Sequence, residues 1–529
     1  MPKACLSMLV LMLYAQVSVA QVIDLSFLQT RPEETGFEET SSYAEVMAFL
    51  EVVAASSERV HLTHFGYSVE GRKLPLAVVG DVAAPTAEAV RATGKLRVFV
   101  QANIHAGEVC GKEAMLMLLR ALGSGKHAAW SDSLVLLIAP IYNADGNERV
   151  SLYNRPRQHG PMGGMGQRPN AQAYDLNRDH MKLDSPEARS LVGLMNDFDP
   201  HVLVDLHTTN GSYHGYHLTY APPLHPNTDA GVLSLLRDQM LPAVTARIKA
   251  KYDWDYYYYG NVPRSPRAER GWYTFDHRPR FNNNYVGLRN RLAILSEAYA
   301  YDTFEDRILS TLYFVEEILN YAHANAADLA AVTEAADASV VGAELGLRAT
   351  FARSEEPVTI LMGEVERQRN PYSGALVLQR TATQTPEPMP EFGTFVATET
   401  TTAPIAYYVP PEMTLVRNKL DDHGIQYTTL AEATSMPVQR FRIDSTAVAA
   451  RPFQGYNERT LFGAYTPVLD ETLPAGTLVV PVGQPLGRLA FSLLEPRSDD
   501  GLTAWALIDR WVEDVAEYPI GRQPASARP

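Results

Sequence analysis

The stretch RVFVQANIHAGEVCGKEA (residues 97–114) joins a short apolar run to a helix-like segment and places His105 and Glu108 at the junction. Two later apolar runs end in a similar way: HVLVDLH stops at His207, and RLAILSE stops at Glu297. Continuous apolar runs of this length are typical of buried strands. Because open α/β sheets bind ligands at the carboxyl ends of their strands, we expect these four side chains to meet at one sheet edge.

Strand-like and helix-like segments alternate between about residues 96 and 321, which predicts an α/β fold with a mostly parallel mixed sheet flanked by helices. Ser185 is expected to cap one helix, with Pro186 in its first turn. Pro242 is expected to kink another. The predicted helices cover residues 107–123, 185–198, 230–252 and 304–326.

The composition changes after about residue 322, where an Ala-rich stretch predicts a helical tail or linker. Short strand-like runs follow, among them TILMGEVER, IAYYVP, TLVVPV and LAFSLLEP, separated by Pro, Gly and Thr clusters. We expect one isolated helix among them, at MTLVRNKLDDHG. The predicted domains are therefore a catalytic domain over residues 21–330 and a smaller β-rich domain of unknown role over 340–529.

The first 20 residues have the pattern of a secretory signal peptide: Lys3, an apolar stretch, and a small-x-small site before Gln21. We therefore expect an exported protein, periplasmic or extracellular, without a membrane span in the mature chain; the alternatives are a membrane anchor or a disordered start. Cys110 is then the single remaining cysteine, and we expect it to be a buried apolar residue. The net charge of −15 argues against a nucleic-acid partner.

The residue types at the predicted sheet edge favour a catalytic zinc site. His105, Glu108 and His207 supply two imidazoles and a carboxylate, which leave one position open for water. Zinc lowers the pKa of such a water and polarises a carbonyl, and Glu297 is placed to move the proton. An H-x-x-E pair alone indicates helix capping more often than metal binding. The addition of His207 and Glu297 in this order reverses that preference.

The series of motifs resembles the zinc carboxypeptidase family, peptidase family M14. The resemblance rests on the H-x-x-E pair, an Asn143–Gly146 turn, the Asn177-Arg178 pair, His207 and the late Glu297, and it covers roughly residues 40–325. It implies one zinc ion per chain, held by His105, Glu108 and His207, with Glu297 as general base and acid.

The same resemblance implies that Asn177 and Arg178 bind the C-terminal carboxylate of a peptide, a task that suits the arginine fork. An ion pair of Arg178 with Asp175 or Asp179 is the alternative. The family also uses an arginine to stabilise the oxyanion; Arg155 and Arg157 compete here, and we favour Arg155. A substrate-capping tyrosine is implied between His207 and Glu297, where Tyr273 and Tyr285 are candidates and neither is assigned.

Two features depart from the family pattern. Asp179 stands where the family has a second asparagine, and we expect it to neutralise part of the charge on Arg178. The loop at 155–174 is long and rich in glycine, and an aromatic, basic stretch at 254–285 either walls the pocket or forms a surface excursion. His201, His214 and His217 are expected to be structural or rim residues.

The predicted function is therefore a zinc-dependent metallocarboxypeptidase acting on peptide or acyl-amino-acid substrates. Two alternatives stay open: a zinc amidohydrolase acting on cell-wall peptides or acyl-amino acids, and a non-catalytic peptide- or glycan-binding protein on the same scaffold. The sequence determines neither the side chain preferred at the cleaved position nor the oligomeric state.

Overall fold

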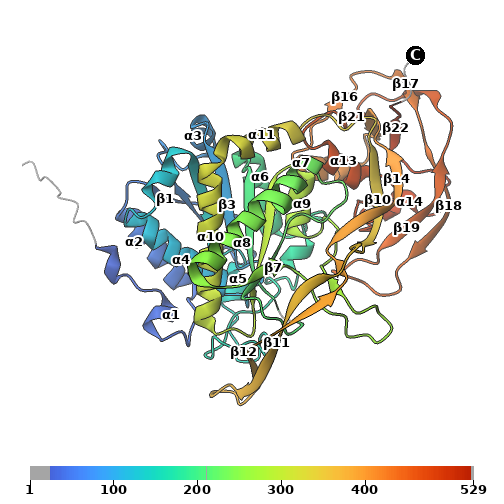
Figure 1. Ribbon diagram of the computed structural model, residues 1–529. Helices are drawn as coiled ribbons and strands as arrows, with labels where there is room; N and C mark the ends of the chain where they lie inside the picture. Colours follow the sequence, from blue (N-terminus) through green and yellow to red (C-terminus); the bar gives the residue numbers. More distant parts are fainter. Residues whose placement is uncertain (1–23, 210, 526–529) are drawn as a thin grey trace, which may run out of the picture.

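An eight-stranded mixed sheet forms the centre of the molecule (Figure 1). The computed structural model describes residues 24–209 and 211–525, so the predicted signal peptide lies outside the described residues. In sheet order the strands are β1 (Val60–Tyr67), β2 (Lys73–Val79), β4 (Leu134–Ala139), β3 (Leu96–Ala102), β5 (Val202–Thr209), β9 (Leu292–Tyr299), β6 (Leu218–Ala221) and β7 (Tyr256–Tyr258).

The four central strands, β4, β3, β5 and β9, are parallel, as the alternating pattern predicts. Every residue of β3, β4 and β5 is buried, which is why their sequences are continuously apolar rather than alternating. The outer strands pair antiparallel through β1–β2, β2–β4 and β9–β6, so the sheet is mixed.

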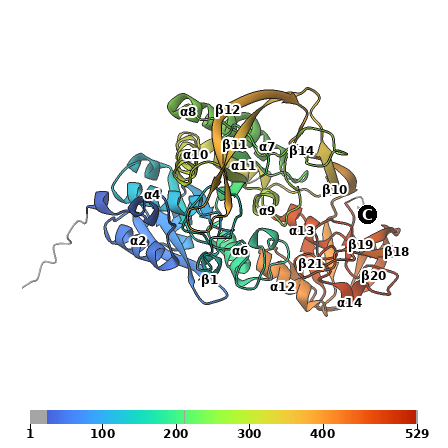
Figure 2. The ribbon, with the colours of Figure 1, turned by 90° about the horizontal axis from the view of Figure 1, so that it is seen from below.

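Helices cover both faces of this sheet. The crossovers β3–β4 and β4–β5 run in opposite directions across the sheet, so right-handed connections place α4 and α6 on opposite faces. Helix α4 packs against α2 and α10, whereas α6 packs against α3 and against α12 (Thr414–His423) of the C-terminal part (Figure 2). The helices of this part are α1 (Arg31–Glu34), α2 (Tyr43–Ala55), α3 (Ala87–Ala92), α4 (Cys110–Gly123), α5 (Ala144–Asn147), α6 (Pro186–Phe198), α7 (Ala230–Ser234), α8 (Leu241–Tyr252), α9 (Asn282–Leu288), α10 (Phe304–Ala324) and α11 (Ala326–Ala336).

The predicted helix boundaries agree with the local chemistry. Ser185 caps α6, because its hydroxyl accepts a hydrogen bond from the Ala188 N–H (3.1 Å), and Pro186 is the first helical residue. Around Pro242 the helix is interrupted, as expected, but by a π-helical segment (Leu235–Met240) rather than by a simple bend. Proline lacks the N–H for the regular i→i−4 bond, and a wider turn absorbs that loss.

The C-terminal part is rich in strands, as predicted (Figure 1). Its two-stranded pairs are β10 (Glu344–Ala352) with β14 (Thr394–Thr402), β11 (Val358–Arg369) with β12 (Leu376–Met389), β17 (Thr434–Val438) with β20 (Leu469–Leu473), and β18 (Phe441–Val448) with β19 (Arg459–Tyr465). A four-stranded sheet contains β16 (Thr428–Thr429), β21 (Leu478–Pro481), β15 (Ala406–Val409) and β22 (Gly521–Gln523). A short pair joins β13 (Glu391–Phe392) to β8 (Trp272–Tyr273) of the N-terminal part.

One expectation for this part is wrong: LAFSLLEP does not form a strand. Most of it lies in helix α13 (Gly487–Leu494), which is buried except at Arg488. A short, uniformly apolar run can be buried on all sides as a strand or as a helix, so the spacing of its apolar residues does not distinguish these two conformations. The predicted helix α12 (Thr414–His423) is present, and α14 (Asp509–Val512) is a further short helix. The division into two domains stays a prediction, because side chains such as Leu345 and Leu489 belong to the same continuous core as the central sheet.

A buried histidine lies where α12 meets the N-terminal part. His423 is fully buried, its Nδ1 is 2.8 Å from the Tyr285 hydroxyl, and its Nε2 is 3.2 Å from the Met181 carbonyl. Neutral imidazole satisfies both contacts by accepting from Tyr285 and donating to Met181. Burial lowers the pKa of His423 to about 3, so the folded protein holds this ring neutral where the unfolded chain takes up a proton.

We therefore expect the free energy of unfolding to fall as the pH drops below about 6.5, the ordinary histidine pKa. Between that value and the folded pKa the unfolded state binds more protons, so acid favours unfolding by about 1.4 kcal/mol per pH unit for this group. His423→Asn should reduce the slope by that amount in denaturant titrations between pH 6 and 4, with chelator present throughout. His61→Asn, at a partly exposed position of β1, controls for the loss of a histidine as such. An unchanged slope in His423→Asn would contradict the assignment.

Candidate metal centre and active site

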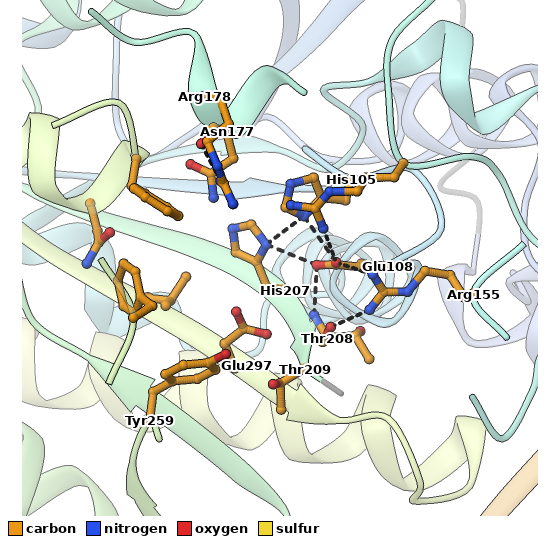
Figure 3. Close-up of a pocket in the computed structure, with 15 residues that line it drawn as sticks. His105, Glu108, Arg155, Asn177, Arg178, His207, Thr208, Thr209, Tyr259 and Glu297 are labelled. Carbon is orange, nitrogen blue, oxygen red and sulfur yellow. Dashed lines mark hydrogen bonds and ion pairs between the residues drawn. The ribbon is translucent and has the colours of Figure 1, made fainter. Parts of the chain in front are cut away.

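His105, Glu108 and His207 converge at the carboxyl ends of β3 and β5 (Figure 3). His105 lies three residues after the end of β3 at Ala102, and the Glu108 N–H donates to the His105 carbonyl (2.8 Å) in a tight turn. Helix α4 begins only at Cys110, so Glu108 lies in this turn rather than in the first helical turn as expected. His207 belongs to β5 itself. All three side chains are buried.

The donor atoms of these residues fit a tetrahedral zinc ion. His105 Nδ1 and His207 Nδ1 are 3.3 Å apart, and each lies 3.0 Å from an oxygen of Glu108. Two ligands of a tetrahedral zinc are separated by roughly 3.3 Å when each bond is about 2.05 Å. Among the described residues, these three form the one group of His, Cys, Asp and Glu donors close enough to share an ion.

Two aspartates, which the sequence analysis did not single out as part of the site, orient the imidazoles. Asp175 Oδ1 lies 3.0 Å from His105 Nε2, and Asp205 Oδ2 lies 2.9 Å from His207 Nε2. A carboxylate at Nε2 keeps the proton there and leaves the Nδ1 lone pair for a metal. Asp205 is two residues before His207 on the same strand, so a same-face Asp-x-His pattern is the signal that could have revealed it.

The electrostatics of the site favour a cation. Burial alone would raise the pKa of Glu108, but His105 and Arg155 hold it well below its usual range. Burial likewise opposes a charged His207, yet Asp205 and Glu108 raise the pKa of this histidine well above its usual value. The pKa of Asp175 is also lowered, against the effect of burial, by His105 and Arg168. These carboxylates therefore keep their negative charge around the two imidazoles.

Glu297 lies opposite His207 in the parallel register of β5 and β9, at the floor of the same pocket (Figure 3). Its Oε2 is buried and has no hydrogen-bond partner in residues 24–209 and 211–525. Burial raises the pKa of Glu297 to about 8, and the nearby charge of Glu108 adds to the shift. A carboxylate without a competing partner, beside the metal donors, is suited to accepting and returning a proton.

Arg155 points into the pocket, whereas Arg157 does not line it. The Arg155 guanidinium donates to the Thr208 carbonyl (2.6 Å) and lies 2.8 Å from Glu108 Oε1. Its backbone has a φ of 50°, an unusual conformation for a residue with a side chain. The structure thus brings the favoured arginine beside the metal donors. Arg168, from the same loop at 155–174, also lines the pocket and was not predicted.

Asn177 and Arg178 lie in a short 3-10 turn (Leu176–Arg178) that Asp175 caps. The Arg178 guanidinium lies 3.9 Å from the centre of the Phe281 ring, and its nearest carboxylate, Asp175, is 4.0 Å away. The fork therefore stacks on an aromatic face.

The expectation that Asp179 neutralises part of the charge on Arg178 is wrong. The Asp179 carboxylate is fully buried and turned towards other partners. It accepts hydrogen bonds from Lys182 Nζ (2.5 Å) and from the N–H and hydroxyl of Ser185 (2.8 and 2.6 Å). Its role is to hold the start of α6, so the substitution in the family pattern leaves the pocket charge unchanged.

The aromatic stretch at 254–285 supplies much of the pocket wall, which decides between the two expectations for it. Tyr259, rather than Tyr273 or Tyr285, lines the pocket, where it lies beside Glu297 (Figure 3). Tyr285 is buried against His423, and Tyr273 stacks on Phe392 at 3.9 Å. Burial raises the pKa of Tyr259 to about 12, so its hydroxyl stays protonated at neutral pH. The full lining is His105, Glu108, Arg155, Arg168, Asn177, Arg178, His207, Thr208, Thr209, Tyr259, Phe275, Phe281, Asn283, Leu295 and Glu297.

Contacts within the fold hold His201, His214, His217 and Cys110, in line with the structural or rim role expected of these histidines and the buried position expected of Cys110. The ring of His214 packs at a tilt against Tyr299, with ring centres 4.0 Å apart, and His217 stacks on Trp254 at 4.5 Å. His201 accepts a hydrogen bond from the Arg97 N–H. Cys110 is buried, 3.0 Å from the Thr208 hydroxyl. None of these belongs to the metal-donor group.

Comparisons with known proteins agree with this geometry. Residues 46–209, which contain the three donor residues and the Asn177-Arg178 pair, match the zinc carboxypeptidase family model. Carboxypeptidase 2 from Trichophyton tonsurans is 26% identical over 486 residues, which cover 86% of this chain and 81% of that protein. Part of this chain thus matches the zinc carboxypeptidase family, and most of its length is similar to proteins named carboxypeptidase. These matches indicate a metallopeptidase, a hydrolase.

Two further comparisons concern other carboxypeptidases. Carboxypeptidase 2 from Trichophyton rubrum is 26% identical over 500 residues, 90% of this chain and 85% of that protein. A metallo-carboxypeptidase from Pseudomonas aeruginosa, solved with (2-guanidinoethylmercapto)succinic acid, aligns at 18% identity and a TM-score of 0.41 over 55% of this chain and 70% of that one. In residues 24–209 and 211–525, no helix is both long and apolar enough to cross a membrane.

The orienting aspartates should matter for metal affinity. Asp205→Asn keeps the shape of the side chain but removes the charge that fixes His207, so zinc affinity should fall about 10- to 100-fold. Competition with a chromophoric chelator measures the change. Asp302→Asn is the matched control, because Asp302 is a buried carboxylate paired with Arg380 at 3.1 Å outside the pocket lining. Equal zinc affinity in Asp205→Asn and wild type would show that the aspartate has no orienting role.

Proposed function

We propose that this protein is a zinc-dependent metallocarboxypeptidase that removes residues from the C-termini of peptides. The observation that carries the proposal is the meeting, in one pocket, of a zinc-type donor set, a carboxylate suited to proton transfer and an arginine fork. Cleavage of a peptide bond next to a free C-terminal carboxylate would use the metal ion, the proton-transferring carboxylate and the arginine fork together.

His105, Glu108 and His207 would hold the metal ion, and their donor spacing supports this assignment. When bound, zinc supplies Lewis-acid chemistry, lowering the pKa of a water molecule and polarising a carbonyl. Asp175 and Asp205 keep both Nδ1 lone pairs available for it.

Glu297 would act as general base and then general acid. It takes a proton from the attacking water and passes it to the nitrogen of the leaving residue, so its net charge is restored in each cycle. Its unpartnered Oε2 supports this role, since no hydrogen bond within the described residues has to be broken first.

Arg155 would stabilise the negative charge that develops on the carbonyl oxygen. Its contacts with Glu108 and the Thr208 carbonyl fix the guanidinium at the edge of the donor group before substrate arrives. A donor held in advance stabilises the transition state without reorganisation.

Asn177 and Arg178 would bind the carboxylate of the substrate's C-terminal residue. The Arg178 guanidinium stacks on Phe281, and its N–H groups that are not bonded to the Asn177 carbonyl would donate to the substrate carboxylate. This recognition places the last peptide bond, and not an internal one, beside Glu297.

The first test uses Glu297→Gln. The variant should bind zinc as wild type does but lose at least a hundredfold in kcat, because glutamine cannot accept the proton. Elemental analysis measures the metal and release of C-terminal residues from a peptide library measures activity. Retained trimming by the variant would exclude this role for Glu297. Zinc-loaded wild type that cleaves only acyl-amino acids or cell-wall peptides would instead support the amidohydrolase.

The second test concerns carboxylate recognition. Arg178→Lys keeps the charge but loses the two-pronged geometry, so KM for peptides with a free C-terminus should rise about tenfold or more while zinc content is unchanged. The same peptides with amidated C-termini are the control, and wild type should cleave them poorly. Equal KM values for wild type and Arg178→Lys would contradict the assigned role.

We also propose export of the protein with removal of residues 1–20, on the basis of the N-terminal sequence pattern. The intact mass of protein recovered from a secreting host should correspond to a chain that begins at Gln21. Recovery of the uncleaved chain in the membrane fraction would favour an anchor.

A further inference from the structure

The segment 280–282 connects the C-terminal part of the chain to the pair predicted to bind the substrate carboxylate. It runs from Arg280, which is buried against C-terminal residues, through Phe281, which lines the pocket, to Asn282 at the start of α9. Arg280 contacts the C-terminal part, Phe281 contacts Arg178, and Asn282 contacts Asn177.

Asp500 fixes Arg280 on the C-terminal side. A single fully buried carboxylate accepts from the Arg280 N–H (2.6 Å) and from its Nε (2.8 Å). The guanidinium also donates to Glu458 (2.7 Å) and lies 4.4 Å from the centre of the Trp505 ring. Because both backbone and side chain of Arg280 are bound to one group, its position is defined by the C-terminal part.

Phe281 and Asn282 carry that position into the site. The Phe281 ring lies under the Arg178 guanidinium at 3.9 Å. The Asn282 N–H donates to the Asn177 side-chain oxygen (2.8 Å). Arg178 is thus supported by Phe281, which directly follows Arg280. Asn177 is supported by Asn282, which is two residues after Arg280.

A second C-terminal contact reaches the same 3-10 turn from the opposite end. The tip of the β18–β19 connection is a tight turn in which Gln454 and Gly455 have φ values of 49° and 87°, as a type I′ turn requires. Gln454 Oε1 accepts from the Asp175 N–H (3.0 Å). Asp175 in turn accepts from the Asn177 N–H (3.0 Å) and so caps the turn that carries Arg178.

We infer that the C-terminal part is a positioning element for carboxylate recognition, with Asp500 and Gln454 as the positioning residues. They act through Arg280–Asn282 and Asp175, and they touch no reacting atom. This inference rests on the proposed function, since it assigns these residues to the binding of a substrate carboxylate by Asn177 and Arg178.

The test measures binding, so that it does not depend on turnover. In the zinc-loaded Glu297→Gln background, calorimetry gives the Kd of N-benzoyl-glycyl-phenylalanine and of its C-terminal amide. Asp500→Asn should raise the Kd of the acid about tenfold, because an amide cannot hold both donors of Arg280. The Kd of the amide, which lacks the recognised carboxylate, should stay within about twofold.

Two further variants separate positioning from simple loss of stability. Gln454→Ala removes one hydrogen bond from a partly exposed side chain, so the protein should stay folded and the acid Kd should rise about threefold. Glu495→Gln is the matched control: Glu495 is a fully buried carboxylate paired with Arg522 at 3.0 Å, away from segment 280–282. It should leave the Kd of the acid unchanged even where it lowers the melting temperature.

Coupling with Arg178 completes the test. If Asp500 acts through Arg178, adding Asp500→Asn to an Arg178→Lys variant should change the Kd of the acid little. If the two residues acted independently, the fold-changes in Kd of the two single variants would multiply. Unchanged acid Kd values in folded Asp500→Asn and Gln454→Ala would overturn the inference, and if Asp500→Asn does not fold, Gln454→Ala decides alone. Equal Kd values for acid and amide in the starting protein would show instead that carboxylate recognition, and with it the proposed function, is wrong.

Discussion

The parallel register of β3, β5 and β9 is the constraint on which the site depends. β3 pairs with β5 so that Ala102 lies opposite Leu206, and β5 pairs with β9 so that His207 lies opposite Glu297. Neighbouring strands are about 4.8 Å apart, so aligned carboxyl ends bring groups from three distant sequence segments within reach of one ion. A slip of one residue would turn His207 or Glu297 to the other face. The buried apolar side chains of the central strands therefore fix the chemistry as well as the fold.

The site concentrates charge that the interior tolerates only because each group has a partner. Asp175 faces His105 and Arg168, and Asp205 faces His207 and Asn282. Buried charges without such contacts are strongly destabilising. Glu297 is the exception, with one buried oxygen unpartnered among the described residues. Burial raises the pKa of Glu297 because no partner stabilises its charged form, and a shifted carboxyl group of this kind is typical of functional sites.

The central sheet, the three metal donors and Glu297 could be predicted because they follow from local patterns. Buried parallel strands are continuously apolar, and the polar residues at their ends are conspicuous in the sequence. Asp175, Tyr259 and Phe281 were not assigned to the site, because loops bring them there through contacts with no periodic signal. The error at Asp179 has the same origin: its neighbour in sequence is Arg178, but its partners are Lys182 and Ser185. For α13, a uniformly apolar run fits strand and helix equally well.

The contacts of Asp500 and Gln454 with the catalytic part also bear on how the chain matures. Both residues lie in the last fifth of the sequence. During synthesis the metal donors and Glu297 emerge first, while the groups that support Asn177 and Arg178 are made near the end. A nascent or truncated chain would therefore contain the metal donors and Glu297 but lack Asp500 and Gln454, which position Asn177 and Arg178. Under the proposed function, selection of peptide ends therefore requires the whole chain, including residues that are made last.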